Sequence, residues 1–250
     1  MKIDSDFFSG RRLLIVTKHQ KETVIAPLLE EALGVQCVVA KDFDTDSLGT
    51  FSGEISRQED ALTTLRQKCL EGMKSEKFDL AVATEGSFGN HPTVFFAPAN
   101  DELIMLIDQK NYLEIVERVL SLETNFQSTE IHSIGDLYSF LDIVQFPSHG
   151  VILKNAEKNW TRIEKGICDF ETLEKVYHEF TSSGMQCFIE TDMRAMHNPT
   201  RMKIIKEASL KLINKLHSVC PVCFLPGFGV VSTEAGLFCS ACSIPPRSTS

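Results

Sequence analysis

The fold class is indicated first by residues 11–40, RRLLIVTKHQKETVIAPLLEEALGVQCVVA, which have the pattern of a strand, a helix and a second strand. The apolar run RRLLIV passes through the polar residues 17–22 into a helical pattern that ends at Gly34, and VQCVVA follows as residues 35–40. Pro27 is expected in the first turn of this helix or at a kink, because proline lacks an amide hydrogen. Such a unit is typical of an α/β protein with parallel strands.

The same alternation continues along the chain. The pattern predicts further strands at FDLAVAT (78–84), TVFFAPA (93–99), ELIMLID (102–108), HGVILKN (149–155) and MQCFIE (185–190), with helices between several of them. We therefore expect an α/β fold with a mixed, largely parallel sheet and flanking helices, plus a small C-terminal four-cysteine zinc ribbon. The expected domains are an α/β domain over 1–216, which carries the candidate ligand site, and a zinc ribbon and tail over 217–250.

Composition restricts the partners. Of the 250 residues, 43% are hydrophobic and 24% are charged, which is ordinary globular composition, and the formal net charge is -9. That charge repels polyanions, so nucleic-acid binding is disfavoured, while a small phosphorylated ligand remains open. No apolar run reaches about 18 residues and the first residues contain acids, so we expect no membrane partner and a soluble cytoplasmic protein. The sequence does not indicate an oligomeric state.

Four cysteines near the end of the chain have the spacing of a metal site. Cys220 and Cys223 form one C-x2-C pair, Cys239 and Cys242 form a second, and fifteen residues lie between the pairs. Two such turns bring four thiolates onto one tetrahedral zinc ion, and four protein ligands indicate a structural role. Two disulfides, or one redox C-x-x-C pair, are the alternatives. Residues 217–250 carry only two fully charged side chains, Glu234 and Arg247, so this ribbon has no basic stripe for phosphates.

Three predicted strands lead into polar segments, residues 17–22, 85–91 and 191–201. If these strands are parallel neighbours, the segments share the edge of the sheet where α/β proteins bind ligands. Helix N-termini and basic side chains there would bind an anion, and carboxylates would hold magnesium together with substrate phosphates. The candidate ligand-binding residues are Thr17, Lys18, Lys21, Ser87, His91, Arg194, Asn198 and Arg201, and the candidate catalytic residues are Glu54, Glu85 and Asp192.

A purely structural interpretation of these residues stays open. Asn198 followed by Pro199 is a natural helix N-cap and first helical position, and many charged residues form surface ion pairs. Glycines at positions 49 and 53 favour a flexible loop that would carry Glu54 over the edge of the sheet. No serine or cysteine has an evident base partner in the sequence, and Cys187 lies in an apolar strand.

The chain is similar to a family of uncharacterised proteins catalogued as a domain of unknown function. The similarity rests on TKHQKE, FDTDSLGTFSGEISR, ATEGSFGNHP, ETDMRAMHNPTRM and the terminal CPVC and CSAC pairs, and it implies no known activity. Residues 12–90 also resemble inosine triphosphate pyrophosphatase-like enzymes, which cleave non-standard nucleoside triphosphates with magnesium. Thr17, Lys21 and Lys68 match positions of that pattern, whereas His19 replaces its asparagine and Glu85-Gly86-Ser87 stands for its Asp-Ser-Gly.

Two functions follow as hypotheses. The first is a zinc-ribbon protein that acts as a divalent-metal-dependent hydrolase on a small phosphorylated or nucleotide ligand, with magnesium activating water. The alternative is a non-catalytic binding or scaffold protein that uses the zinc ribbon for protein contact. The expected cofactors are structural zinc and, for the hydrolase, magnesium.

Overall fold

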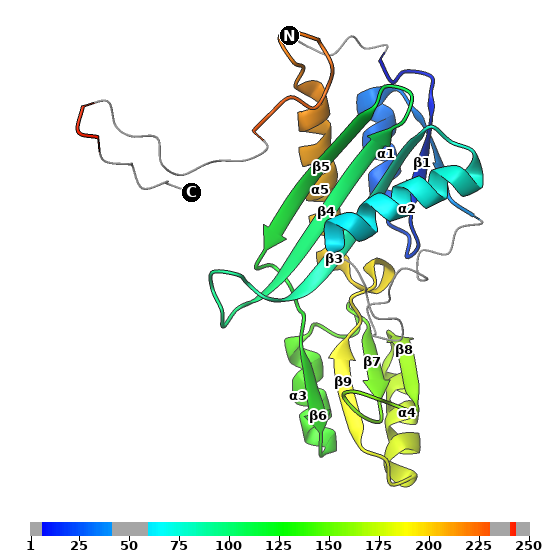
Figure 1. Ribbon diagram of the computed structural model, residues 1–250. Helices are drawn as coiled ribbons and strands as arrows, with labels where there is room; N and C mark the ends of the chain where they lie inside the picture. Colours follow the sequence, from blue (N-terminus) through cyan, green and yellow to red (C-terminus); the bar gives the residue numbers. More distant parts are fainter. Residues whose placement is uncertain (1–6, 42–59, 231–240, 244–250) are drawn as a thin grey trace.

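The computed structural model describes residues 7–41, 60–230 and 241–243 of the chain, which form two sheets with helices packed on them (Figure 1). The first sheet has the strand order β2-β1-β3-β4-β5. Its strands are β1 (Arg12–Val16), β2 (Gln36–Val39), β3 (Leu80–Asn90), β4 (Pro98–Asp108) and β5 (Leu113–Ser121). Strand β1 pairs in parallel with β2 and β3, whereas the pairs β3–β4 and β4–β5 are antiparallel.

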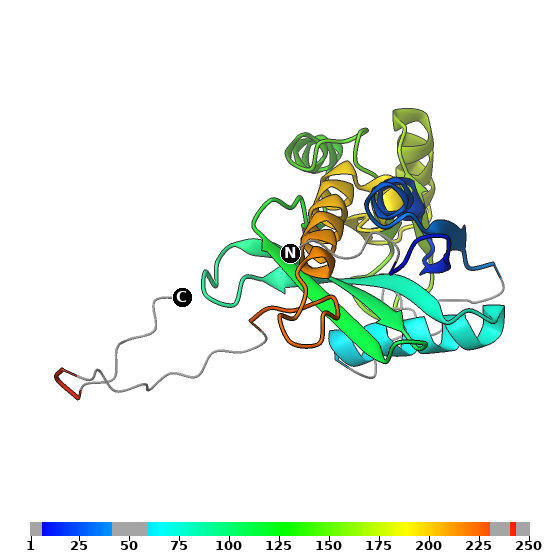
Figure 2. The ribbon, with the colours of Figure 1, turned by 90° about the horizontal axis from the view of Figure 1, so that it is seen from above.

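Helices cover both faces of this sheet. Helices α1 (Glu22–Leu33) and α5 (Pro199–His217) pack on one face against Leu13 and Ile15 of β1, and α2 (Ala61–Glu76) packs on the other against Leu14 and Val16. This division follows from the alternation of side chains along a strand, which sends successive residues to opposite faces. Seen from above, the sheet lies between α2 on one side and α1 with α5 on the other (Figure 2).

The helix ends follow local sequence signals. Gly34 ends α1 with a left-handed φ of 65° and donates its N–H to the carbonyl of Glu30 at 3.0 Å. Asn198 caps α5 by accepting the N–H of Arg201, and Pro199 is the first helical residue, as the sequence predicts. Pro27 lies in the second turn of α1, so the expectation of a first-turn position is wrong.

The second sheet is inserted between β5 and α5. Its order is β6-β9-β7-β8, with strands β6 (Ser128–Ile131), β7 (Val151–Lys154), β8 (Ile163–Ile167) and β9 (Cys187–Thr191), and all its pairs are antiparallel. Helices α3 (Ile134–Ile143) and α4 (Phe170–Ser182) bury Leu137, Phe140, Leu173 and Phe180 against it. The chain leaves β9 through the short 3-10 helix η2 (Ala195–His197) and enters α5.

The sheets correct the predicted strand directions. The fold is α/β with a mixed first sheet, but it is not largely parallel, because β1–β2 and β1–β3 are the only parallel pairs among the described strands. Only residues 109–112 separate β4 from β5, and a connection that short forms a hairpin rather than a crossover. Residues 93–97, expected in a strand, form the turn between β3 and β4, where the Nδ1 atom of His91 accepts the N–H groups of Thr93 and Val94.

No helix among the described residues is long and apolar enough to cross a membrane.

The segment that follows α5 packs against the first sheet. After α5 the chain turns back on itself, with a single β-bridge between Val219 and Pro226, and Gly227 packs closely on Ile115 of β5. Contact with β5 therefore holds the first described residues of the predicted ribbon region against the first sheet.

Candidate functional site

Five charged side chains are buried against the first sheet, three of them on the face of α1 and α5 (Lys21, Glu102, Arg201) and two on the face of α2 (Lys68, Glu85), and together we call them the buried charge cluster. They are Lys21 at the start of α1, Lys68 on α2, Glu85 on β3, Glu102 on β4 and Arg201 on α5. None of the five is more than 8% exposed, and Glu102 and Arg201 are completely buried. Charged groups are rarely buried this far unless they are paired, so the contacts among them determine what the cluster can do.

Arg201 and Glu102 form the centre of the cluster. The guanidinium of Arg201 donates from Nε to Oε2 of Glu102 at 3.1 Å and from NH2 to Oε1 at 3.3 Å, while NH1 donates to the carbonyl of Met193 at 2.6 Å. Its face lies 5.1 Å from the ring centre of Phe88. A Cβ atom at Gly86 would come within 2.5 Å of both Arg201 and Glu102, so this close approach requires glycine.

The two lysines differ in their pairing. Lys68 forms an ion pair with Glu85, whereas Lys21 donates to the hydroxyl of Thr84 at 2.8 Å and lies 3.8 Å from the carboxylate of Glu102. Burial, followed by repulsion from Arg201, lowers the pKa of Lys21 to about 7. Among the described residues, Lys21 and Arg201 thus share the carboxylate of Glu102, whereas Lys68 and Glu85 form a pair of their own.

The turn that leads into α1 is strained. His19 and Gln20 both have left-handed backbone angles, with φ of 68° and 60°, and such a conformation costs a residue other than glycine about 1–3 kcal/mol. The hydroxyl of Thr17 donates to the carbonyl of Lys18 at 2.7 Å within the same turn. Strain of this kind is often found where a turn presents its backbone to a ligand.

A pocket of about 420 Å³ lies between the starts of α1 and α5. Gln20, next to Lys21, lines one side, and Pro199, two residues before Arg201, lines another. The remaining lining residues are Val24, Ala195, Met196, Met202, Lys203 and Lys206. Its volume suits a small organic molecule, and its lining combines apolar side chains with two exposed lysines.

The structure brings some of the predicted ligand-binding residues together. Lys21 and Arg201 belong to the buried charge cluster, and Thr17 and Lys18 lie in the strained turn beside it. Ser87 is half-buried on β3, two residues beyond Glu85. These residues come from the first sheet and from α5, and they surround the carboxyl end of β1.

Other predicted residues have different roles or places. His91 fixes the turn between β3 and β4, Asn198 caps α5 and donates to Asn125 at 2.8 Å, and Arg194 binds Asp192 through Nε at 3.0 Å and NH2 at 2.6 Å. The polar segment 191–201 comes at the end of β9 in the second sheet, so the condition that its strand is a parallel neighbour of β1 and β3 is not met. Arg201 reaches the cluster because α5 leaves the second sheet and packs on the first.

The structure places two of the three predicted catalytic carboxylates in ion pairs. Glu85 pairs with Lys68, and Asp192 accepts from Arg194 and from the N–H of Gly166 at 3.1 Å. Glu54 lies outside the described residues. Among residues 7–41, 60–230 and 241–243, no group of three or more His, Cys, Asp or Glu side chains could hold a metal ion. A magnesium ion held by one or two carboxylates together with a substrate phosphate stays a prediction.

The predicted zinc ligands are only partly described. Cys220, Cys223 and Cys242 are free thiols in the structure, and Cys239 lies outside the described residues. The four-cysteine zinc site therefore stays a prediction from the spacing of the sequence.

Sequence reasoning did not include two residues of this site, Thr84 and Glu102, and it named Lys68 only as a match to the pyrophosphatase-like pattern. Lys68 lies on the apolar face of α2, three residues after the buried Leu65, and Glu102 begins the apolar run ELIMLID. A charged residue at a position that should face the core is the signal that could have identified both, because such a charge needs a buried partner.

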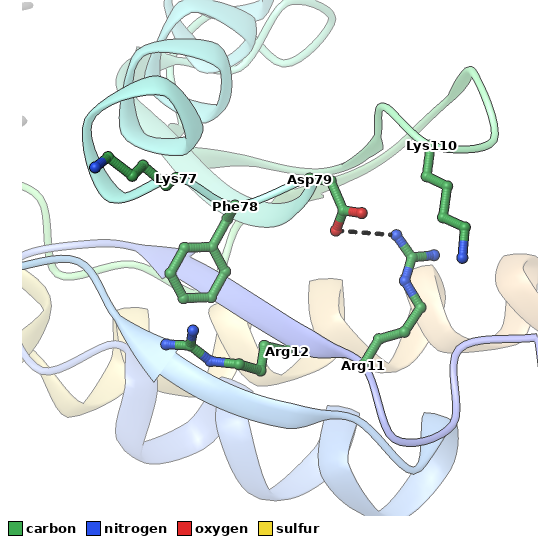
Figure 3. Close-up of a pocket in the computed structure, with 6 residues that line it drawn as sticks. All are labelled: Arg11, Arg12, Lys77, Phe78, Asp79 and Lys110. Atoms are coloured by element: carbon green, nitrogen blue, oxygen red, sulfur yellow. Dashed lines mark hydrogen bonds and ion pairs between the residues drawn. The ribbon is translucent and has the colours of Figure 1, made fainter.

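A second basic pocket lies at the opposite end of β1 (Figure 3). It has a volume of about 530 Å³ and is lined by Arg11, Arg12, Lys77, Phe78, Asp79 and Lys110. Arg11 binds Asp79 at 3.2 Å and the buried Asp108 at 2.6 Å, and the guanidinium of Arg12 lies 4.4 Å from the ring centre of Phe78. Its two arginines are thus already engaged by acidic or aromatic partners.

One comparison with known proteins gives a match. The sequence model of a family described as a domain of unknown function (DUF6671) matches residues 68–250. No curated protein matches the chain. The matched range begins at Lys68 and includes Glu85, Glu102 and Arg201 of the buried charge cluster, and the family description assigns no activity.

Proposed function

The chain belongs to the DUF6671 family, a domain of unknown function, and we propose that it binds a small ligand carrying a phosphate group at the buried charge cluster. The single observation that supports this proposal is the position of Lys21, which is buried and lies 3.8 Å from its nearest carboxylate among the described residues, that of Glu102, to which the guanidinium of Arg201 also binds. A buried cation is stabilised when an anion binds beside it, because the low local dielectric strengthens the attraction.

The place of the cluster in the fold supports the same ligand class. Lys21 lies at the carboxyl end of β1, where the chain turns into α1, and the N-terminal ends of helices favour anions. Lys203 and Lys206 add positive charge at the mouth of the neighbouring pocket, and Val24 and Met202 give it an apolar wall. We therefore expect a ligand with a phosphate at one end and an organic group at the other.

Lys21 gives the proposal a specific signature. Because its pKa is lowered to about 7, a substantial fraction of Lys21 is unprotonated at neutral pH. A bound phosphate favours the charged amine and raises that pKa, so ligand binding should be accompanied by uptake of a proton.

The test is isothermal titration calorimetry with inorganic phosphate and a panel of nucleoside mono-, di- and triphosphates, each measured in two buffers of different ionisation enthalpy. We expect binding with a buffer-dependent enthalpy in the wild type, and at least about tenfold weaker binding with no buffer dependence in Lys21→Met. Lys175→Ala, which changes an exposed lysine on α4, is the matched control and should bind like the wild type. Absence of binding by every member of the panel would contradict the proposal.

Hydrolysis of the ligand is a separate proposal, carried by the predicted carboxylates Glu54, Glu85 and Asp192. It requires that Glu85 leave Lys68, or that Asp192 leave Arg194, to bind magnesium beside the phosphate. Magnesium-dependent release of phosphate or pyrophosphate from a panel member, abolished in Glu85→Gln, is the expected result. If the panel binds but is not turned over with magnesium present, ligand binding stands without hydrolysis.

A second candidate function is protein contact through the C-terminal region, with zinc as a structural ion. The described residues after α5 expose Val222 by 83%, Phe224 by 55%, Phe228 by 53% and Val230 by 80%, and exposed apolar side chains close together are typical of interaction surfaces. The spacing of the four cysteines supports zinc binding by this region.

The zinc proposal is tested by elemental analysis of the purified protein. We expect one zinc per chain in the wild type and loss of the metal in Cys239→Ser, whereas Cys37→Ser, which changes a half-buried cysteine of β2, should keep it. Metal-free wild-type protein with disulfides between the cysteine pairs would contradict the proposal.

A further inference from the structure

Cys168 and His197 form a thiol–imidazole pair beside the second sheet. The Sγ atom of Cys168 lies 3.4 Å from the Nδ1 atom of His197, within hydrogen-bonding distance for sulfur. Cys168 follows β8 directly and precedes Asp169, the N-cap of α4, while His197 is the last residue of η2. The cysteine is exposed, so a small molecule can reach its sulfur atom.

Two glycines make room for this pair. A Cβ atom at Gly150 would lie 3.1 Å from the sulfur of Cys168 and 3.0 Å from the Cβ atom of His197, and one at Gly166 would lie 2.9 Å from Nε2 of His197. The N–H of Gly150 also donates to the carbonyl of His197 at 2.8 Å. The imidazole is therefore held closely against the backbone on two sides, which keeps Nδ1 directed at the sulfur.

The charged groups around the pair are Asp192, Arg194 and Asp169. Desolvation and the two aspartates raise the pKa of the Cys168 thiol, and desolvation lowers the pKa of His197. At neutral pH the pair therefore consists of a neutral thiol and a neutral imidazole, and the imidazole is free to accept the proton of the thiol. Arg194 lies beside the same imidazole, since the Cβ atom at Gly166 would be 3.0 Å from its NH2.

We propose that Cys168 is a catalytic nucleophile that accepts an acyl group from a small ester or thioester, with His197 as its general base. The sulfur attacks the carbonyl carbon and forms a C–S bond while its proton moves to Nδ1 of His197. The bond from the carbonyl carbon to the leaving group then breaks, and the leaving alcohol or thiol takes that proton. Water cleaves the thioester in the second half-reaction, with His197 accepting a proton from water and returning it to the sulfur.

The chemistry of the pair favours acyl transfer over a redox reaction. Thiols that react with peroxides or disulfides need a lowered pKa, because the thiolate is the reactive species, and the pKa of Cys168 is raised. When the electrophile is a carbonyl group, a base that removes the thiol proton during the attack makes a lowered thiol pKa unnecessary. This inference does not depend on the proposed phosphate site.

The test uses the full chain and p-nitrophenyl acetate as the probe. We expect a burst of p-nitrophenolate and one acetyl group on the peptide that contains Cys168, located by mass spectrometry after digestion. The burst should disappear in Cys168→Ser and slow at least about tenfold in His197→Ala at neutral pH. His178→Ala, which changes an exposed histidine on α4, should leave the rate unchanged. Acetylation of Cys168 no faster than that of the free thiol of N-acetylcysteine at the same pH would overturn the proposal.

A second measurement needs no variant and therefore does not depend on whether His197→Ala folds. The rate of acetylation of Cys168 in the wild type is followed from about pH 5 to pH 10. A thiol assisted by His197 reaches a plateau once the imidazole is neutral, whereas an unassisted thiol gains about tenfold in rate per pH unit until its own raised pKa is reached. A plateau near neutral pH supports the proposal, and a continuous rise to alkaline pH contradicts it.

Discussion

The two ends of strand β1 each carry a group of basic side chains, yet the two groups differ in nearly every physical property. At the amino end, Arg11 and Arg12 line an open pocket, and hydrogen bonding to Asp108 raises the pKa of Arg11 above its ordinary value. At the carboxyl end, Lys21 and Arg201 are buried, and the pKa of Lys21 falls to about 7. The difference lies in pairing and burial, because Arg11 is bound directly to two carboxylates and Arg12 is exposed, whereas Lys21 is buried with no carboxylate of the described residues in direct hydrogen-bonding contact.

The comparison shows that a count of cations does not identify a binding site. The amino-end pocket holds four basic residues, but its two arginines already have acidic or aromatic partners. At the carboxyl end, Lys21 is buried and lies 3.8 Å from its nearest carboxylate among the described residues, that of Glu102. Four changes test this contrast, beginning with the one that should have the largest effect.

Arg201→Ala should destabilise the protein by about 3–5 kcal/mol, because it leaves the carboxylate of Glu102 buried without its partner. The free energy of unfolding is measured by urea denaturation. Arg118→Ala, which removes a surface partner of Asp101, is the matched control and should cost about 1 kcal/mol or less. The double variant Arg201→Met with Glu102→Leu should lose less stability than Arg201→Ala. A loss below about 1 kcal/mol in Arg201→Ala would contradict the role given to the buried charge cluster.

Gly86→Ala should cost about 1–3 kcal/mol, since its Cβ atom would come within 2.5 Å of Arg201 and Glu102 and push the ion pair apart. Gly89→Ala is the control on the same strand, because a Cβ atom there meets nothing within 4 Å. It should change the unfolding free energy by no more than about 0.5 kcal/mol. Equal effects of the two substitutions, measured by urea denaturation, would show that Gly86 is not needed for close packing.

The pH dependence of stability should reveal Lys21. Its pKa is lowered from 10.5 in the unfolded chain to about 7 in the folded protein, so between these values the unfolded chain binds a proton that the folded protein lacks. The contribution of Lys21 to the free energy of unfolding therefore rises with pH in this window, by at most about 1.4 kcal/mol per unit, and is constant below it.

The measurement is the difference between wild type and Lys21→Met, taken from denaturation curves at several pH values. Buried thiols such as Cys69 have raised pKa values and contribute the opposite slope, but they are present in both proteins and cancel. A difference that does not change between pH 7 and pH 10 would mean that Lys21 stays protonated in the folded protein.

Arg12→Ala, at the amino end, should have the smallest effect. The contact of Arg12 with Phe78 is at the surface and contributes about 0.5–1 kcal/mol. The change in thermal unfolding should be correspondingly small, and phosphate binding at the buried charge cluster should be unaffected. An effect as large as that of Arg201→Ala would mean that the two ends of β1 do not differ as described.

Much of the local structure could be predicted from the sequence. The alternation of strands and helices, the end of α1 at Gly34 and the cap of α5 at Asn198 all follow from signals within a few residues. Lys21 and Arg201 were also identified as anion-binding candidates, and both belong to the cluster. The predictions of the helix ends are confirmed because helix ends depend on local hydrogen bonding, whereas anion binding by Lys21 and Arg201 stays a prediction.

The pairings within the site could not be predicted in the same way. Arg201 is 99 residues from Glu102, and Lys21 is 63 residues from Thr84. The prediction of a largely parallel sheet was wrong for a related reason. A buried apolar strand has the same composition whether its neighbour runs parallel or antiparallel. The pair of Cys168 and His197 depends on the packing of η2 against the second sheet, and the spacing of the two residues gives no sign of it.

The insertion of the second sheet has a consequence for the order in which the protein folds during synthesis. Its core is built from one continuous stretch, from Ile131 to Ile189, so this part can fold as soon as that stretch has left the ribosome. The core of the first sheet instead joins β1, near the start of the chain, to α5, which ends at His217. We therefore expect the first sheet to be completed after the second, although its strands are synthesised earlier. Its apolar faces should stay exposed to chaperones until α5 has been synthesised and packs on them.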